Sequence, residues 1–168
     1  MRKRLLLAVL ATALCLGPGL ARGQTNGGAA GPGAAPPGPD LEKDILHLNT
    51  IGAFSAGFVL QAYGYIGVLA DVLSKQVYPP DLVRTMLGET TTYMRNINAH
   101  LMKYHTGPPI APGDLEFISS ITEIINYLIA EAEALSSFTE TKSDSDLRRY
   151  DEARNNAWKT IRKTFKVK

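Results

Sequence analysis

The 168-residue chain contains one cysteine, Cys15, and three histidines, His47, His100 and His105. Because no cysteine follows residue 15, the rest of the chain has no disulfide, no thiolate nucleophile and no cysteine metal site. Covalent haem attachment through Cys-x-x-Cys-His is excluded for the same reason. No glutamate is followed three residues later by histidine, so the chain also lacks the Glu-x-x-His pairs of diiron helical bundles.

Catalytic motifs are equally scarce. The sequence has no glycine elbow around a serine, and no glycine-rich phosphate loop between a strand and a helix. No basic stretch alternates with aromatic residues as a nucleic-acid surface requires. We therefore predict a non-enzymatic protein without a cofactor and without a nucleic-acid partner.

The N-terminus has the three parts of a secretory signal. Residues 2–4 are basic, residues 5–16 form a short apolar run, and Gly17-Pro18-Gly19 interrupts it. Ala21-Arg22-Gly23 places small residues at the cleavage positions, so we predict a signal peptide over 1–23, with cleavage near Gly23/Gln24 and a secreted or periplasmic protein. A lipoprotein signal at Cys15 is the weaker interpretation, because Leu14 stands where a small residue is needed.

Removal of the signal changes the charge of the chain. The full sequence has 18 basic and 16 acidic residues and a formal charge of +2. Four of the bases lie in the signal, so the mature chain has 14 bases against 16 acids, a charge of −2. Residues 24–39, QTNGGAAGPGAAPPGP, carry no charge, no aromatic and no branched aliphatic side chain. They predict a disordered linker, and the leader and linker together are typical of an exported bacterial protein.

Residues 40–168 contain helical patterns but no strand signal and no repeat. Proline, glycine and capping residues divide them: Asp40 begins the first helix, Pro79-Pro80 separate the first two, and Ser143 caps the last. The predicted helices cover about 40–77, 80–105, 112–139 and 144–166. The short connections favour an all-α domain, an antiparallel up-down-up-down four-helix bundle.

Apolar stripes at spacings of three and four residues support this prediction. On the third helix the stripe contains Ile118, Ile121, Ile125, Leu128, Ala132 and Leu135. On the second it contains Val83, Met86, Thr90, Met94, Ile97, Leu101 and Tyr104, and on the fourth Leu147, Tyr150, Trp158, Ile161 and Phe165. We expect Arg154, inside that last stripe, to reach outward to solvent, and Glu131 to lie on the solvated face of its helix.

The segments that contain the last two predicted helices have net charges of opposite sign. Residues 107–146 hold eight acids against Lys142, and residues 147–168 hold eight bases against Asp151 and Glu152. The two helices are therefore expected to pair electrostatically as neighbours, although each exposed ion pair contributes only about 0.3–0.5 kcal/mol. A functional alternative is that the basic last helix contacts anionic lipid or an acidic partner.

The most unusual segment is residues 52–71, GAFSAGFVLQAYGYIGVLAD, which carries no charge before Asp71. An interior glycine costs a helix about 0.5–1 kcal/mol relative to alanine, so its four glycines need a structural reason. Ala53, Gly57, Gly64 and Gly67 lie on one helical stripe. We predict close approach of another helix there, from the same chain or from a second copy.

Three interpretations of this segment remain open. It is the buried centre of the bundle, or an interface to a second copy or a helical protein partner, or a transmembrane helix over 48–70. Gln61 and two tyrosines in the middle disfavour the membrane span, and the other helices need its apolar surface. The preferred function is a binding, scaffolding or self-associating structural module.

A periplasmic carrier of a small ligand, copper or haem is a further alternative. Met102, His105 and His100 are the weak candidates for a Cu(I) site, since thioether and imidazole are ligands that this soft ion accepts. Methionine more often fills gaps in a core, and no metal site is assigned.

Overall fold

The computed structural model describes residues 39–107 and 111–167, and this part of the chain is all helical. The four helices are α1 (Pro39–Ser74), α2 (Pro80–Thr106), α3 (Pro112–Thr141) and α4 (Asp144–Phe165). No residue within the described ranges is in a strand. The all-α prediction is confirmed. The predicted signal peptide, Cys15 and nearly all of the predicted linker lie outside the described residues.

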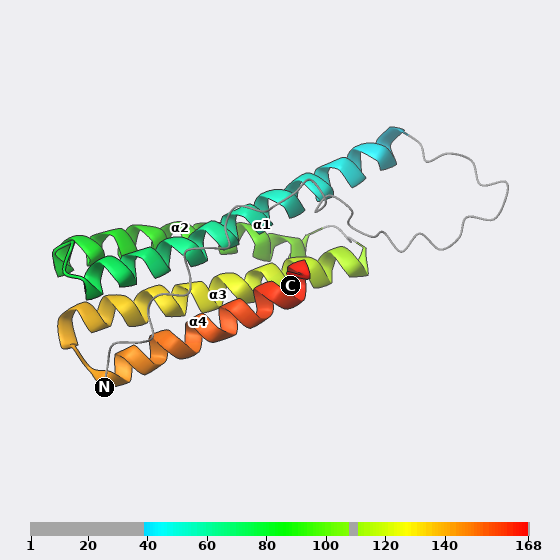
Figure 1. The fold of residues 1–168 in the computed structure, drawn as a ribbon. Coiled ribbons are helices and arrows are strands. Elements are labelled where there is room, and N and C mark those ends of the chain that lie inside the picture. The colour runs from blue at the N-terminus through cyan, green and yellow to red at the C-terminus, as the bar shows by residue number, and fades with distance from the viewer. Residues whose placement is uncertain (1–38, 108–110, 168) are drawn as a thin grey trace. The chain divides into compact units, whose positions relative to one another are not determined.

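The chain divides after Phe54 into two compact units. The described residues of the first unit, 39–54, are the N-terminal turns of α1, where the Thr50 hydroxyl donates to the Leu46 carbonyl at 2.8 Å. The second unit begins at Ser55 and contains the remainder of α1 and the other three helices, coloured from green-cyan to red in Figure 1.

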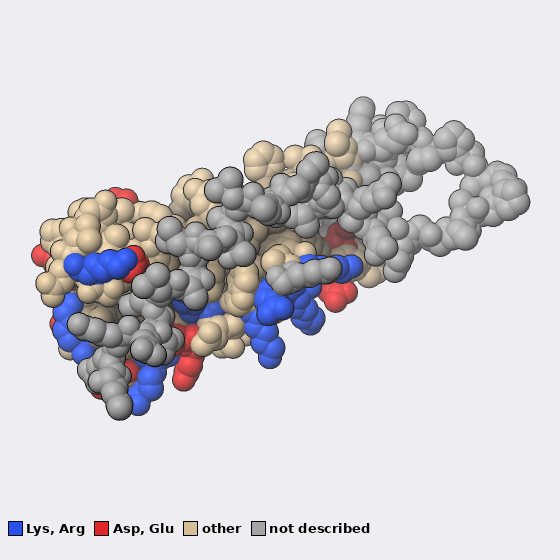
Figure 2. Space-filling model, viewed as in Figure 1, with Lys and Arg blue, Asp and Glu red and all other residues tan. Residues whose placement is uncertain are grey.

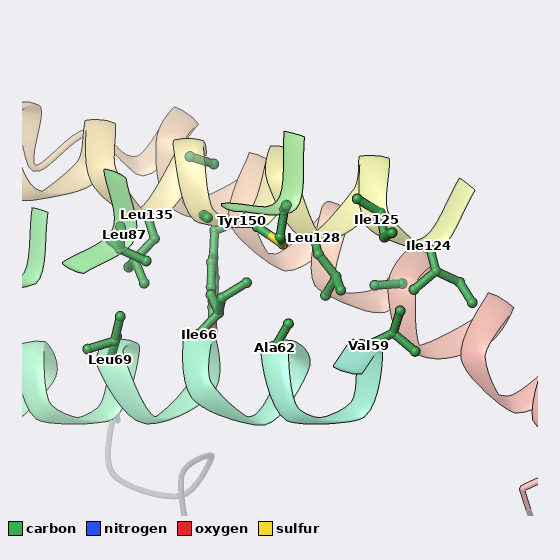
Figure 3. Close-up of a cluster of buried hydrophobic side chains, with 14 of the residues drawn as sticks. Val59, Ala62, Ile66, Leu69, Leu87, Ile124, Ile125, Leu128, Leu135 and Tyr150 are labelled. Atoms are coloured by element: carbon green, nitrogen blue, oxygen red, sulfur yellow. The ribbon is translucent and has the colours of Figure 1, made fainter. Parts of the chain in front are cut away.

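The apolar core of the second unit is made by all four helices. On α1 the buried residues are Val59, Ala62, Ile66, Leu69 and Leu73, at helical spacings of three and four. Figure 3 shows that Val59, Ala62, Ile66 and Leu69 point toward the other helices, from which Leu87 of α2, Leu128 of α3 and Tyr150 of α4 are labelled. Burying one large aliphatic side chain contributes about 1.5–3 kcal/mol, so this cluster is the main source of stability.

The packing partners of each helix follow from these stripes. Helix α3 packs against both α2 and α4. Helix α1 contacts α2 through the rings of Phe58 and Tyr93, and α4 through the stacked rings of Tyr63 and Trp158. The predicted stripe of α3 is buried over its whole length. On the outer helices, however, Tyr104 and Leu147 are 37% and 39% exposed, so the stripes of α2 and α4 were drawn too wide.

Left-handed residues follow the ends of α1, α3 and α4. Gln76 has φ 57°, its N–H donates to the Leu73 carbonyl, and the Val77 N–H donates to the Val72 carbonyl. This is the hydrogen-bond pattern of a Schellman motif, and it ends α1 at Ser74 rather than near Val77 as predicted. Lys142, with φ 53°, ends α3 in a similar way, its N–H donating to the Phe138 carbonyl.

The start of α4 agrees with the predicted cap in part. The Ser143 hydroxyl accepts a hydrogen bond from the Ser145 N–H at 3.1 Å. Asp146 does not complete a capping box, because its carboxylate instead accepts from the Thr141 hydroxyl at 2.6 Å and pairs with Arg149. The Thr141 hydrogen bond is the main cause that lowers the pKa of Asp146. This contact ties the end of α3 to the first turn of α4.

Exposed ion pairs connect α2 to α3 rather than α3 to α4. Arg84 pairs with Glu140, and Arg95 pairs with Glu133. The expectation that the acids of the third helix pair with the bases of the fourth is therefore corrected for the surface of the described residues. Among the described residues, the one ion pair between α3 and α4 is that of Glu131 and Arg154, and it is buried.

Candidate functional site

The most unusual chemical feature of the described residues is a buried ion pair between α3 and α4. Glu131 is completely buried, and the Arg154 side chain is 17% exposed to solvent. Arg154 Nη1 donates to Glu131 Oε1 at 2.5 Å and also to the backbone carbonyl of Tyr63 at 3.2 Å. One guanidinium thus connects α1, α3 and α4.

Helix α1 forms the rest of the surroundings of Arg154. The guanidinium carbon lies 4.0 Å from the centroid of the Tyr63 ring, a cation–π arrangement, and that ring stacks on Trp158 at 5.3 Å between centroids. A Cβ atom on Gly67 would lie 2.7 Å from Arg154 Nη2. The absence of a side chain at Gly67 therefore makes room for the guanidinium. We call Glu131, Arg154, Tyr63 and Gly67 the ion-pair centre.

Burial dominates the electrostatics of this centre. It raises the pKa of Glu131 to about 7, and the opposing attraction of Arg154 does not cancel it. The direction agrees with the geometry, because Glu131 Oε2 is buried and has no hydrogen-bond partner, so the carboxylate is only half satisfied. Burial also raises the pKa of the nearby Tyr150 hydroxyl to about 12. The group of this centre that changes charge near neutral pH is Glu131.

This centre was not predicted, and both of its charged residues were placed incorrectly from the sequence. Glu131 points into the core instead of lying on the solvated face of α3, and Arg154 points inward instead of out. The physical reason is that each has a partner of opposite charge inside. A signal existed: Glu131 lies three residues after Leu128 and four before Leu135, and Arg154 lies inside the α4 stripe, so two adjacent helices carry opposite charges on their buried faces.

The structure separates the small residues predicted to share one stripe. Gly67 faces the side chain of Arg154, not the backbone of another helix. Gly57 and Gly64 are exposed, with no atom within 4 Å of an added Cβ. Ala53 is exposed in the first unit. Close approach to a second copy stays a prediction for Gly57 and Gly64.

The weak metal candidates Met102, His105 and His100 lie in the last two turns of α2. Met102 is 49% exposed and His100 is also exposed, while the His105 side chain lies outside the described part of the structure. Within the described ranges, no group of three or more His, Cys, Asp or Glu side chains is arranged to hold a metal ion. A polar groove between α2 and α3 is lined by Gly88, Thr91, Thr92, Arg95, Glu133 and Ser136.

Among the described helices, α1 contains one segment, Asn49–Ser74, that is long and apolar enough to cross a membrane. Its mean hydropathy is 1.4, and 28% of the most apolar window is buried in the structure. Comparison of the chain with models of protein families, with curated proteins and with solved structures gives no match.

The first prediction concerns the ion-pair centre. Arg154→Met leaves the Glu131 carboxylate buried without a partner, and we expect it to lower the free energy of unfolding by about 3–5 kcal/mol near pH 8. The double variant Glu131→Leu/Arg154→Met replaces both charges with apolar groups and is expected to be as stable as the original protein or more so. Urea unfolding followed by circular dichroism measures both. Equal loss in the single and double variants would show that the pair itself stabilises the fold.

The second prediction follows from the raised pKa of Glu131. Between its unfolded value near 4.5 and its folded value near 7, the folded chain holds a proton that the unfolded chain releases. Glu131 therefore makes stability fall as pH rises through this range, by on the order of 3 kcal/mol. Glu131→Gln should remove this slope from urea midpoints measured at about pH 5 and about pH 7.5. The exposed Glu133→Gln is the control and should keep it.

The third prediction distinguishes the glycines. Gly67→Ala forces the fixed guanidinium to move and should destabilise the protein by about 1–3 kcal/mol. Gly88→Ala, in open space on α2, should instead stabilise it by about 0.5–1 kcal/mol through helix propensity. Thermal unfolding tests both, and a stabilising Gly67→Ala would contradict the role given to Gly67.

Proposed function

We propose that the protein is an exported, non-enzymatic helical module that associates with a second copy of itself through the outer face of α1. Its export depends on the predicted signal peptide. Its four helices are proposed to form an antiparallel up-down-up-down bundle, which agrees with the packing of α3 between α2 and α4. The proposal is carried by one observation, the exposed and uncharged outer face of α1.

The outer face consists of Gly57, Gln61, Gly64, Tyr65 and Val68, all exposed. Val68 is 52% exposed and Tyr65 is 37% exposed. Gly57 and Gly64 are seven residues apart, two helical turns, and Gln61 lies between them. These residues lie opposite the buried stripe of Val59 and Ile66, so they are free to meet another molecule.

The glycines on this face are costly without a partner. Each lowers helix stability by about 0.5–1 kcal/mol relative to alanine. At Gly67 the reason is inside the chain, because Arg154 occupies the space. At Gly57 and Gly64 no described atom uses the space, which supports an external helix that approaches the backbone closely.

A second copy suits this face because of its charge and polarity. Residues 51–70 include no acidic or basic side chain, so two copies meet there without repulsion between like charges. In a symmetric dimer the same patch meets itself, and the Gln61 amide is both a donor and an acceptor. The face therefore satisfies its one amide by pairing with its own copy.

The second candidate is an inner-membrane protein with residues 48–70 as the span. It is favoured by the length, hydropathy and low burial of Asn49–Ser74. Against it stands the opposite face of the helix, where Ile66 packs in the core and Gly67 accommodates a charged Arg154. A carrier of copper, haem or a small ligand remains the third alternative, which elemental analysis and absorbance of the purified protein would reveal.

The fourth prediction tests self-association. Gly64→Leu places a large side chain where the second backbone is expected to approach, and should convert an assembly seen by light scattering into monomers. The matched control is Gly88→Leu, since Gly88 is also an exposed interior helix glycine with open space around it, but lies on α2. It should leave the assembly unchanged.

Two results would overturn the proposal. If the original protein is a monomer at high concentration, the outer face of α1 is not a self-association surface. If the mature protein resists alkaline extraction from membranes, the membrane span replaces it.

A further inference from the structure

The C-terminal half of α4 and the residue that follows this helix carry a group of basic side chains that form no ion pair with a described acid. Lys159, Arg162, Lys163 and Lys166 are all exposed. Within residues 39–107 and 111–167 none of the four is in an ion pair, and Arg162 Nε donates a 3.5 Å hydrogen bond to the Val167 carbonyl. We call these four residues the basic patch. Figure 2 shows Lys and Arg side chains gathered over this end of α4.

Several other basic side chains of the described structure, unlike those of the basic patch, form ion pairs. Arg84, Arg95 and Arg149 on the surface each pair with an acid, and the buried Arg154 pairs with Glu131. Outside the patch, Arg148 is another exposed arginine that forms no ion pair with a described acid. On α3, the exposed carboxylates of Glu133 and Glu140 pair with arginines of α2.

Helix geometry concentrates three of these four charges on one side. Arg162 and Lys163 lie three and four residues after Lys159, so these three share one face of α4, opposite the buried Ala157 and Ile161. Lys166 follows directly after the last turn. From Lys159 to Phe165 the helix rises about 9 Å, which is close to the Debye length at physiological salt, and Lys166 comes next in the chain. The charges therefore act together. The Phe117 ring of α3 contacts the Phe165 ring of α4. Asp114 and Glu116 precede Phe117 closely in the sequence, so they reduce the local positive charge, although neither forms an ion pair with the basic patch.

We propose that the basic patch binds the anionic surface of a phospholipid membrane, holding the helical unit at the surface without inserting it. Each Lys or Arg near an anionic bilayer strengthens binding by about fivefold, so four give a several-hundredfold effect. This contact is independent of the outer face of α1 and of its self-association.

The form of the patch favours lipid over other polyanions. A patch about 10 Å long spans a few lipid headgroups but is small beside the roughly 800 Å² that each partner contributes to a stable protein interface. Its aromatic neighbours are already occupied, Trp158 by Tyr63 and Phe165 by Phe117, so they are not available to stack on nucleic-acid bases. Exposed amines and guanidinium on one helix face meet the simple requirement of a flat, densely anionic surface.

The experiment is co-sedimentation of the purified mature protein with vesicles of phosphatidylcholine alone, or with about one third phosphatidylglycerol. We expect binding to the anionic vesicles only, weakened by at least about tenfold in 0.5 M salt. The variant Lys159→Gln/Arg162→Gln/Lys163→Gln/Lys166→Gln should lose binding by about a hundredfold or more.

The control removes the same formal charge elsewhere, with Lys75→Gln, Arg84→Gln, Lys142→Gln and Arg148→Gln, and should retain most of the binding. Circular dichroism shows whether both variants are folded. The proposal is wrong if anionic vesicles are not bound, if both variants lose binding equally, or if neutral vesicles bind as well. It is also wrong if a polyglutamate peptide or a DNA duplex binds the patch more tightly than the vesicles do.

Discussion

The contact between Glu131 and Arg154 determines the arrangement of three of the four helices. Arg154 Nη1 reaches α3 through the Glu131 carboxylate and α1 through the Tyr63 carbonyl. A buried ion pair of this kind is weak evidence for stability, because removing two charges from water costs about as much as their attraction returns. Its effect is on specificity. A shift of α1 along its axis would separate Tyr63 and Gly67 from the guanidinium, and a buried charge without partners is far more costly than a misplaced leucine.

The same contact explains why one helix contains glycines of two different kinds. Gly67 is required by the space that Arg154 occupies, so its cost in helix propensity is offset inside the chain. Gly64 lies three residues and Gly57 ten residues before Gly67, on a neighbouring part of the helix surface, where no described atom uses the space beside them. The fixed position of the inner face also fixes which residues face outward. The outer face of α1 is thus the consequence of an internal constraint, and the proposed partner meets a surface that the ion-pair centre has oriented.

Local signals in the sequence were sufficient to predict the number and type of the helices. Pro80 and Pro112 mark the starts of α2 and α3, and Ser143 caps α4, because these residues act on the backbone within one turn. The end of α1 was predicted too late because Gln76 adopts a left-handed conformation. Glycine or asparagine at this position would have indicated such a conformation in the sequence, but glutamine does not. The ion-pair centre was missed for a different reason. Its members are 23 and 91 residues apart in the chain, and periodicity on one helix assigns a charged residue to the surface unless the facing helix is considered with it.

The distribution of charge follows from the geometry of α3, which has neighbours on two sides. Its outward acids Glu133 and Glu140 lie within reach of α2, where Arg95 and Arg84 neutralise them, and its inward acid Glu131 takes Arg154 from α4. The net charges of the two C-terminal segments suggest that they neutralise each other, but side-chain direction prevents it. The exposed basic residues near the C-terminus of α4 also face favourably the partial negative charge of its own last turn. The attraction to that helix end stabilises the fold whether or not a partner is bound, so the basic patch persists in the free protein and is ready to meet an anionic surface.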